Sequence, residues 1–178
     1  ALAMVFQIEM EPELAEKYYR RALSESDEPT RIQNNYGSFL FEQQRYPDAF
    51  EYFQKAAANT MYPGRSRVYE NLGLTALKLN QRPQAKTYFQ KALRLDPTQS
   101  RSLLEIAIIA YEDKEYVPSR EYYTRFKKDG EQNARSLLLG IRLATIFEER
   151  NLAASDALQL KRLYPTSAEY QQYLLEKK

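Results

Sequence analysis

Four arginines recur along the chain at regular intervals, and their side chains have the chemistry of a site that binds carboxylates. At spacings of 36, 34 and 34 residues, this arginine column comprises Arg31, Arg67, Arg101 and Arg135. A guanidinium group presents its N–H donors in a planar fork that matches a carboxylate. One interpretation is a cationic surface that binds an extended or carboxylate-bearing partner. The other is a series of ion pairs inside the protein, with Glu28, Glu70 or Glu105 as acceptors.

The composition argues against catalysis and against a metal site. The chain of 178 residues contains no histidine and no cysteine. The usual general base, the thiolate nucleophile and the commonest metal ligands are therefore missing, and a Ser-His-Asp arrangement is impossible. The net charge is +2, from 26 basic and 24 acidic residues, which is too balanced for a nucleic-acid surface. We expect a protein that is not an enzyme and that needs no cofactor, metal or nucleic acid.

Small and aromatic residues repeat at the same intervals as the arginines. Gly37 and Gly73 are 36 residues apart, and each opens an apolar stretch. A second pattern combines a small residue, an aromatic residue four positions later and another small residue: Ala49, Phe53 and Ala56, then Ala85, Phe89 and Ala92. Proline follows the repeats, as at Pro97. Together these residues resemble the packing seam of tetratricopeptide (TPR) repeats, each of which is an antiparallel pair of helices, A and B.

The resemblance implies an all-α fold: a right-handed superhelix of antiparallel helix pairs with a C-terminal capping helix. We expect a single TPR domain over 1–178, with repeats at about 1–29 (partial), 30–65, 66–99, 100–132 and 133–165, and the capping helix at 166–178. Prolines and polar boundaries predict helices over 1–9, 12–24, 30–44, 47–59, 66–80, 83–95, 100–114, 117–128, 134–149, 152–163 and 168–177.

Two features of the second half depart from the simple pattern. Gly130 is expected to end its helix in a left-handed conformation. In the fifth repeat Ala153 and Ala157 are expected to keep the seam, whereas Leu160 replaces a small residue and Gly140 lies one position out of column.

Helices A line the concave face of a TPR stack, so the predicted protein-binding surface lies on them. An arginine in the first helical turn is mildly unfavourable beside the helix dipole, so local helix chemistry does not require the arginine column. The surface is completed by residues farther along these helices: Asn34, Phe41, Glu70, Leu74, Leu77, Leu104 and Ile108. The apolar members form either a floor for an amphipathic helix or contacts with the next repeat. Asn34 either binds a partner's backbone or fixes the start of its helix.

A narrower resemblance comes from segments that lie between the seam positions. In chain order they are VFQIEMEPELA (5–15), NNYGSFLFEQQRY (34–46), YPGRSRVYENLG (62–73), EYVPSREYY (115–123), NARSLLLGIRLA (133–144) and LQLKRLYP (158–165). These segments resemble the type IV pilus biogenesis lipoproteins of Gram-negative bacteria, the PilF/PilW pilotins. That resemblance implies a scaffold at the periplasmic face of the outer membrane. Its partner would be the secretin, the ring through which the pilus leaves the cell, and its role would be to localise and multimerise that ring.

The resemblance also sets expectations for the N-terminus and leaves one alternative function. Members of this family carry a signal peptide and a lipid-modified cysteine, so we expect an N-terminally truncated chain. We expect it to be monomeric and to be attached to the membrane only through a lipid anchor that this chain lacks.

The alternative is a generic TPR adaptor or co-chaperone that binds a peptide in its concave groove. Carboxylate clamps of that kind use lysine and asparagine at positions that here hold Asn34, Ser38, Glu70, Leu74, Leu104 and Ile108. Only Asn34 suits such a clamp.

Overall fold

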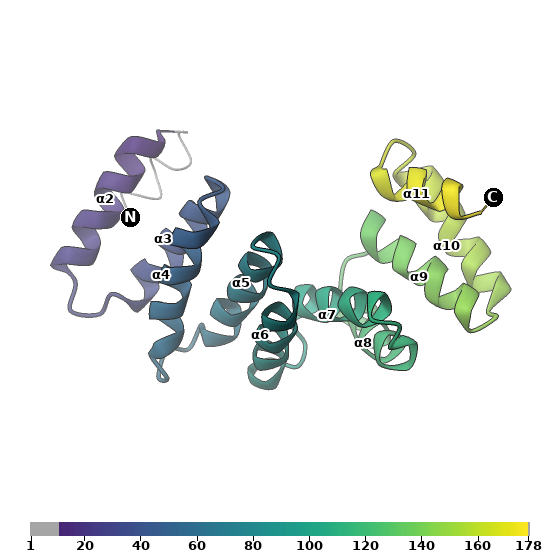
Figure 1. Cartoon of the computed structure of the whole chain (residues 1–178), viewed down its shortest axis with the longest axis horizontal. Coiled ribbons are helices and arrows are strands. Elements are labelled where there is room, and N and C mark those ends of the chain that lie inside the picture. Colours follow the sequence, from purple (N-terminus) through teal and green to yellow (C-terminus); the bar gives the residue numbers. More distant parts are fainter. Residues whose placement is uncertain (1–10, 178) are drawn as a thin grey trace. The chain divides into compact units, whose positions relative to one another are not determined.

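The computed structural model describes residues 11–177, which fold into α-helices joined by short turns and loops, without a β-strand. This part of the chain contains ten helices (Figure 1): α2 (Pro12–Glu25), α3 (Thr30–Glu42), α4 (Tyr46–Ala58), α5 (Arg65–Lys78), α6 (Arg82–Leu95), α7 (Ser100–Glu112), α8 (Tyr116–Asp129), α9 (Ala134–Ile146), α10 (Arg150–Leu163) and α11 (Ala168–Glu176). The predicted all-α fold is confirmed, and each predicted helix in this range is present, with ends that differ by at most three residues. The helix predicted over 1–9 lies outside the described residues.

The helices form two compact units, and the chain passes from one to the other between Pro97 and Thr98. In the first unit α2 packs on α3, α3 on α4, α4 on α5 and α5 on α6. In the second unit α7 packs on α8, α8 on α9, and α9 on both α10 and α11. The boundary lies two residues before the predicted junction between the third and fourth repeats. A single TPR domain spanning both units stays a prediction.

Helix-B aromatic rings that press against helix-A glycines hold the first unit together. Phe53 of α4 is 1% exposed and Phe89 of α6 is 0% exposed. A Cβ atom on Gly37 would lie 2.8 Å from Cδ1 of Phe53, and one on Gly73 would lie 2.6 Å from Cε1 of Phe89. Both separations are shorter than carbon atoms tolerate, so only glycine lets the two helices approach this closely. Gly37 and Gly73 each lie against the aromatic ring that the seam pattern places four residues after an alanine of helix B.

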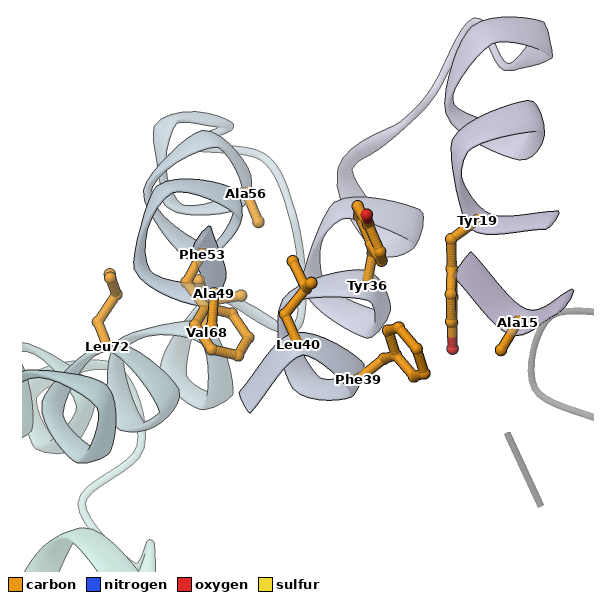
Figure 2. Close-up of a cluster of buried hydrophobic side chains, with 10 residues drawn as sticks. All are labelled: Ala15, Tyr19, Tyr36, Phe39, Leu40, Ala49, Phe53, Ala56, Val68 and Leu72. Carbon is orange, nitrogen blue, oxygen red and sulfur yellow. The ribbon is translucent and has the colours of Figure 1, made fainter. Parts of the chain in front are cut away.

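The same core extends from α2 to α5 through further aromatic and small residues. The ring of Tyr19 lies 5.3 Å from that of Tyr36 and 5.6 Å from that of Phe39, and the three rings fill the space between α2 and α3 (Figure 2). The alanines of the predicted seam are completely buried: Ala49, Ala56, Ala85 and Ala92. Pro97 is different, because it is exposed in the segment after α6. It follows the end of the helix and is not part of the packed seam.

The second unit replaces the glycine contact with a hydrogen bond. The position of Gly37 and Gly73 is taken by Ala107, and the hydroxyl of Ser119 on α8 donates to the Ala107 carbonyl at 2.7 Å. Tyr123 and Phe126 of α8 are 5% and 3% exposed. A separate cluster joins α9 to α10 and α11, and it consists of Leu137, Leu138, Ile141 and Leu160 with Tyr170 and Tyr173 packed against it.

The left-handed residues of the structure lie where the sequence did not predict them. Gly130 has φ −85° and ψ 138°, so its predicted left-handed conformation is wrong. Positive φ values occur instead inside each helix pair, at Gln44, Asn80, Lys114 and Glu148. There the chain closes a tight turn in which, for example, the Arg45 amide donates to the Leu40 carbonyl at 2.9 Å. Sequence reasoning missed these positions because none of them is a glycine.

The seam of the fifth repeat also differs from the prediction. Ala153 and Ala157 are only half-buried, whereas Asp156 is 3% exposed and Leu160 is fully buried. A Cβ atom on Gly140 would lie 2.4 Å from the Tyr123 hydroxyl oxygen and 2.5 Å from Oδ2 of Asp156, so both oxygens pack on this glycine. Within the described residues Oδ2 of Asp156 is buried without a hydrogen-bond partner. Burial raises the pKa of this carboxyl, although nearby Lys127 partly opposes the shift.

Replacing Phe89 with alanine tests the seam of the first unit. Phe89→Ala removes a fully buried ring and leaves a cavity, so we expect the free energy of unfolding to fall by about 3–5 kcal/mol in urea denaturation. Gln84→Ala, at an exposed position of the same helix, is the control and should stay within about 0.5 kcal/mol. Similar losses in both variants would contradict the packing role of Phe89.

Replacing Asp156 with asparagine tests the buried carboxyl. Because the folded pKa is raised, the stabilisation from the protonated acid is complete below the unfolded pKa of about 3.8 and is lost as the pH rises through the folded pKa. In urea denaturation at pH 7.5, the free energy of unfolding of Asp156→Asn should therefore exceed that of the parent by roughly 1 kcal/mol. This gain should vanish at pH 3.5. The exposed Asp129→Asn is the control. A gain that is the same at both pH values would refute this account.

Candidate protein-binding surface

The arginine column lies at the starts of four helices, two in each unit. Arg31 and Arg67 belong to α3 and α5, and Arg101 and Arg135 belong to α7 and α9. All four side chains are exposed, within the first three residues of their helices. Arg31 also lines a cleft of about 700 Å³ between the segments 26–32 and 59–63. The first-turn placement that the sequence predicts is therefore present in each unit.

One member of the column forms an ion pair inside the second unit. Nη1 and Nη2 of Arg135 donate to the two carboxylate oxygens of Glu105 on α7, at 2.6 and 2.9 Å. The Glu105 side chain is only 5% exposed, whereas that of Arg135 is 48% exposed. These hydrogen bonds raise the pKa of the Arg135 guanidinium. The ion-pair interpretation therefore applies to Arg135, whose pair with Glu105 connects the successive helices A α7 and α9.

Asn34 lies between two helices A of the first unit. Its Oδ1 accepts a hydrogen bond from Nδ2 of Asn71 on α5 at 3.2 Å, and the residue is 8% exposed. Its backbone carbonyl also accepts from the Ser38 hydroxyl, at 3.1 Å. A buried amide of this kind needs partners, and Asn71 supplies one of them. Asn34 therefore connects two repeats, and a bond from it to a protein partner stays a prediction.

The apolar members of the predicted surface divide by exposure. Phe41, Leu74, Leu77 and Ile108 are half-buried, so part of each side chain remains accessible. The ring of Phe41 meets that of Tyr46 edge-on at 5.2 Å. Leu104 and Glu70 are only 4% and 9% exposed. Those two residues offer little surface to a partner.

A cleft of about 160 Å³ in the second unit brings predicted and unpredicted residues together. It is lined by the predicted Ile108 and Arg135, and also by Tyr111 and Arg142 from the same two helices. Glu169 and Gln172 of α11 close its other side. Sequence reasoning missed Tyr111 and Arg142, although each lies on the same helix face as a predicted residue, three positions after Ile108 and seven after Arg135. The contribution of α11 was not visible in the sequence.

The chemistry of these surfaces is that of hydrogen-bond donors beside apolar patches. Within residues 11–177 no cluster of acidic side chains is placed to hold a metal ion. None of the described helices has the length and apolar character needed to cross a membrane. Exposed arginines next to half-buried aromatic and aliphatic side chains are typical of surfaces that bind other proteins.

Comparison with known families identifies the class of the fold. Tetratricopeptide repeat profiles match the chain over residues 28–98 and 71–134. The Hsp70-Hsp90 organizing protein 1 of Glycine max is 31% identical over 106 residues, which cover 60% of this chain and 18% of that protein. The chain is therefore a TPR protein, as its seam predicts.

Longer matches identify the family within that class. The type IV pilus assembly protein PilF of Pseudomonas aeruginosa PAO1 is 55% identical over 177 residues, covering 99% of this chain and 70% of that protein. A solved PilF structure matches with a TM-score of 0.95 over 98% of this chain and 79% of that chain. The crystal structure of PilW, a widely conserved type IV pilus biogenesis factor, matches at 27% identity with a TM-score of 0.77, over 97% of this chain and 80% of that one. The chain belongs to the PilF family and is a TPR protein of type IV pilus biogenesis.

Replacing two arginines of the column separately distinguishes Arg135, which is paired with Glu105, from Arg101. Arg135→Met strands the buried Glu105 carboxylate, so we expect a loss of about 1–3 kcal/mol in the free energy of unfolding. Arg101→Met changes an exposed residue at the same helical position and should stay within about 0.5 kcal/mol. If the two variants melted alike, the Glu105 pair would have no structural role.

Proposed function

We propose that this protein is a non-enzymatic scaffold that binds the secretin subunit of the type IV pilus. In this role it assists the secretin to reach the outer membrane and to form its multimer there. The observation that carries the proposal is the 55% identity with PilF over 99% of the chain. The match runs through both units, and an identity of 55% is more than the few positions of the repeat pattern alone require.

The exposed side chains of helices A fit a protein partner. Arg31 and Arg67 of the first unit and Arg101 of the second carry guanidinium groups at helix starts, where they can reach carboxylates. Half-buried Phe41 and Leu74 supply apolar area farther along α3 and α5. Such a combination suits a segment that has both acidic and apolar side chains. Binding of this kind requires no cofactor.

The proposed location is the periplasmic face of the outer membrane. In this proposal a lipid anchor outside the present chain holds the protein there as a monomer. The described helices contribute no membrane span. The TPR units would then face the periplasm, where secretin subunits arrive.

The alternative is a general TPR adaptor that clamps the carboxylate of a peptide, and the similarity to the Hsp70-Hsp90 organizing protein favours it over part of the chain. Two residues oppose it. Asn34 already shares a hydrogen bond with Asn71, and Glu70 places an acidic group where a clamp needs a donor. The scaffold of pilus biogenesis is therefore the better supported proposal.

Charge reversal of two exposed arginines tests the secretin proposal. We expect Arg67→Glu/Arg101→Glu to bind the purified periplasmic domains of the secretin at least about tenfold more weakly than the parent, by isothermal titration calorimetry. Arg94→Glu/Arg150→Glu reverses two exposed charges elsewhere and should bind like the parent. Equal binding by both double variants would exclude the arginine surface, and absence of binding by the parent would contradict the secretin as partner.

A further inference from the structure

A second cleft, larger than the one at Arg135, lies among four helices of the second unit. Its volume is about 460 Å³, and residues of α7, α9, α10 and α11 line it. The lining is largely apolar, from Tyr111, Ile141, Ile146, Ala153, Ala154 and Tyr173, and its polar residues are Arg142, Thr145, Glu176 and Lys177. The Ile146 residue of this lining is 43% exposed to solvent. The cleft thus leaves apolar surface accessible to an incoming side chain.

Two cationic side chains line this cleft, Arg142 and Lys177, and Arg142 is paired with the Glu176 carboxylate of the same chain. Nε and Nη2 of Arg142 donate to the two oxygens of Glu176 at 3.1 and 2.5 Å. The Arg142 side chain is 19% exposed, and its guanidinium carbon lies 5.6 Å from the centre of the Tyr111 ring. Hydrogen bonds from Arg142 lower the pKa of Glu176, so this carboxylate is ionised at neutral pH. Arg142 is therefore fixed in the orientation that binds a carboxylate in bidentate fashion.

The helix that carries this carboxylate has no buried side chain. Glu176 is the last residue of this helix, α11, which has nine residues. Its own side chain is 42% exposed. The helix is attached mainly through Tyr170 and Tyr173, which pack against the cluster of α9 and α10. An incoming carboxylate can replace Glu176 with the same two hydrogen bonds while the two tyrosines stay in place.

We propose that this cleft is a second protein-binding site, which takes an apolar side chain followed by an acidic residue from a partner protein. Glu176 occupies the carboxylate position until the partner arrives. Charge complementarity selects the acidic residue, because Arg142 is the bidentate donor of the cleft, and the apolar lining selects the neighbouring side chain. The proposal extends the protein-binding role and does not require the secretin to be the partner.

A titration with short peptides tests this site without the secretin. The probe is the acetylated and amidated peptide Gly-Ser-Ile-Glu-Ser-Gly, and the matched control peptide has Gln in place of Glu. We expect the backbone amide NMR signals of residues 141–154 to shift with the Glu peptide, and the Gln peptide to bind about tenfold more weakly. Glu176→Gln removes the internal competitor, so it should bind the Glu peptide roughly threefold more tightly than the parent.

Two further variants separate binding from folding. Arg142→Glu/Glu176→Arg keeps the ion pair of α11 with its charges exchanged, so it should melt like the parent but lose the Glu peptide. Ala154→Phe fills the cleft from an exposed position and should also lose it. The exposed Arg150→Gln on α10 is the control and should bind like the parent. Equal binding of the Glu and Gln peptides, or no binding of either by Glu176→Gln, would overturn the proposal.

Discussion

The contact between a helix-B aromatic ring and a helix-A glycine is the constraint on which the first unit depends. Phe53 lies on Gly37 and Phe89 lies on Gly73, each at a distance that excludes a Cβ atom. This contact sets the separation of the two helices in a repeat and orients helix A about its own axis. The face of helix A that meets the ring is buried, so the arginines at the helix starts lie on an exposed part of the surface. The seam thus determines which face of helix A is buried and which face carries the exposed arginines.

The second unit meets the same constraint with different chemistry and accepts a polar cost. Ala107 takes the glycine position and receives a hydrogen bond from Ser119. In the next repeat the glycine has moved by one residue, and Gly140 packs against the oxygens of Tyr123 and Asp156. A buried carboxyl of this kind lowers stability at neutral pH, because its charged form is poorly solvated. This carboxyl lies on α10, and the next helix, α11, has no buried residue.

The arginines of helices A fall into two groups, those paired with a glutamate and those exposed at helix starts. Arg135 and Arg142 lie on one face of α9, and each makes a bidentate pair with a glutamate of another helix. Arg31, Arg67 and Arg101 are exposed at equivalent helix starts. A guanidinium group that binds an internal glutamate in this way is also suited to the carboxylate of another protein. The chain that carries these arginines belongs to the PilF family, TPR proteins of type IV pilus biogenesis.

The sequence by itself determined the helices, the seam and the class of protein, because these depend on residue size and on regular spacing. Gly73 and Phe89 show this well, since the interval between repeats identifies both and the structure buries both. Tertiary structure alone decided which arginine is paired, since the partner of Arg135 lies 30 residues away on another helix. It also decided the left-handed turns at Gln44 and Lys114, where chain closure imposes a conformation that the side chain does not favour. Spacing reports which residues share a helix face, but contacts between helices depend on how those helices pack, and that packing placed α11 and Glu176 beside Arg142.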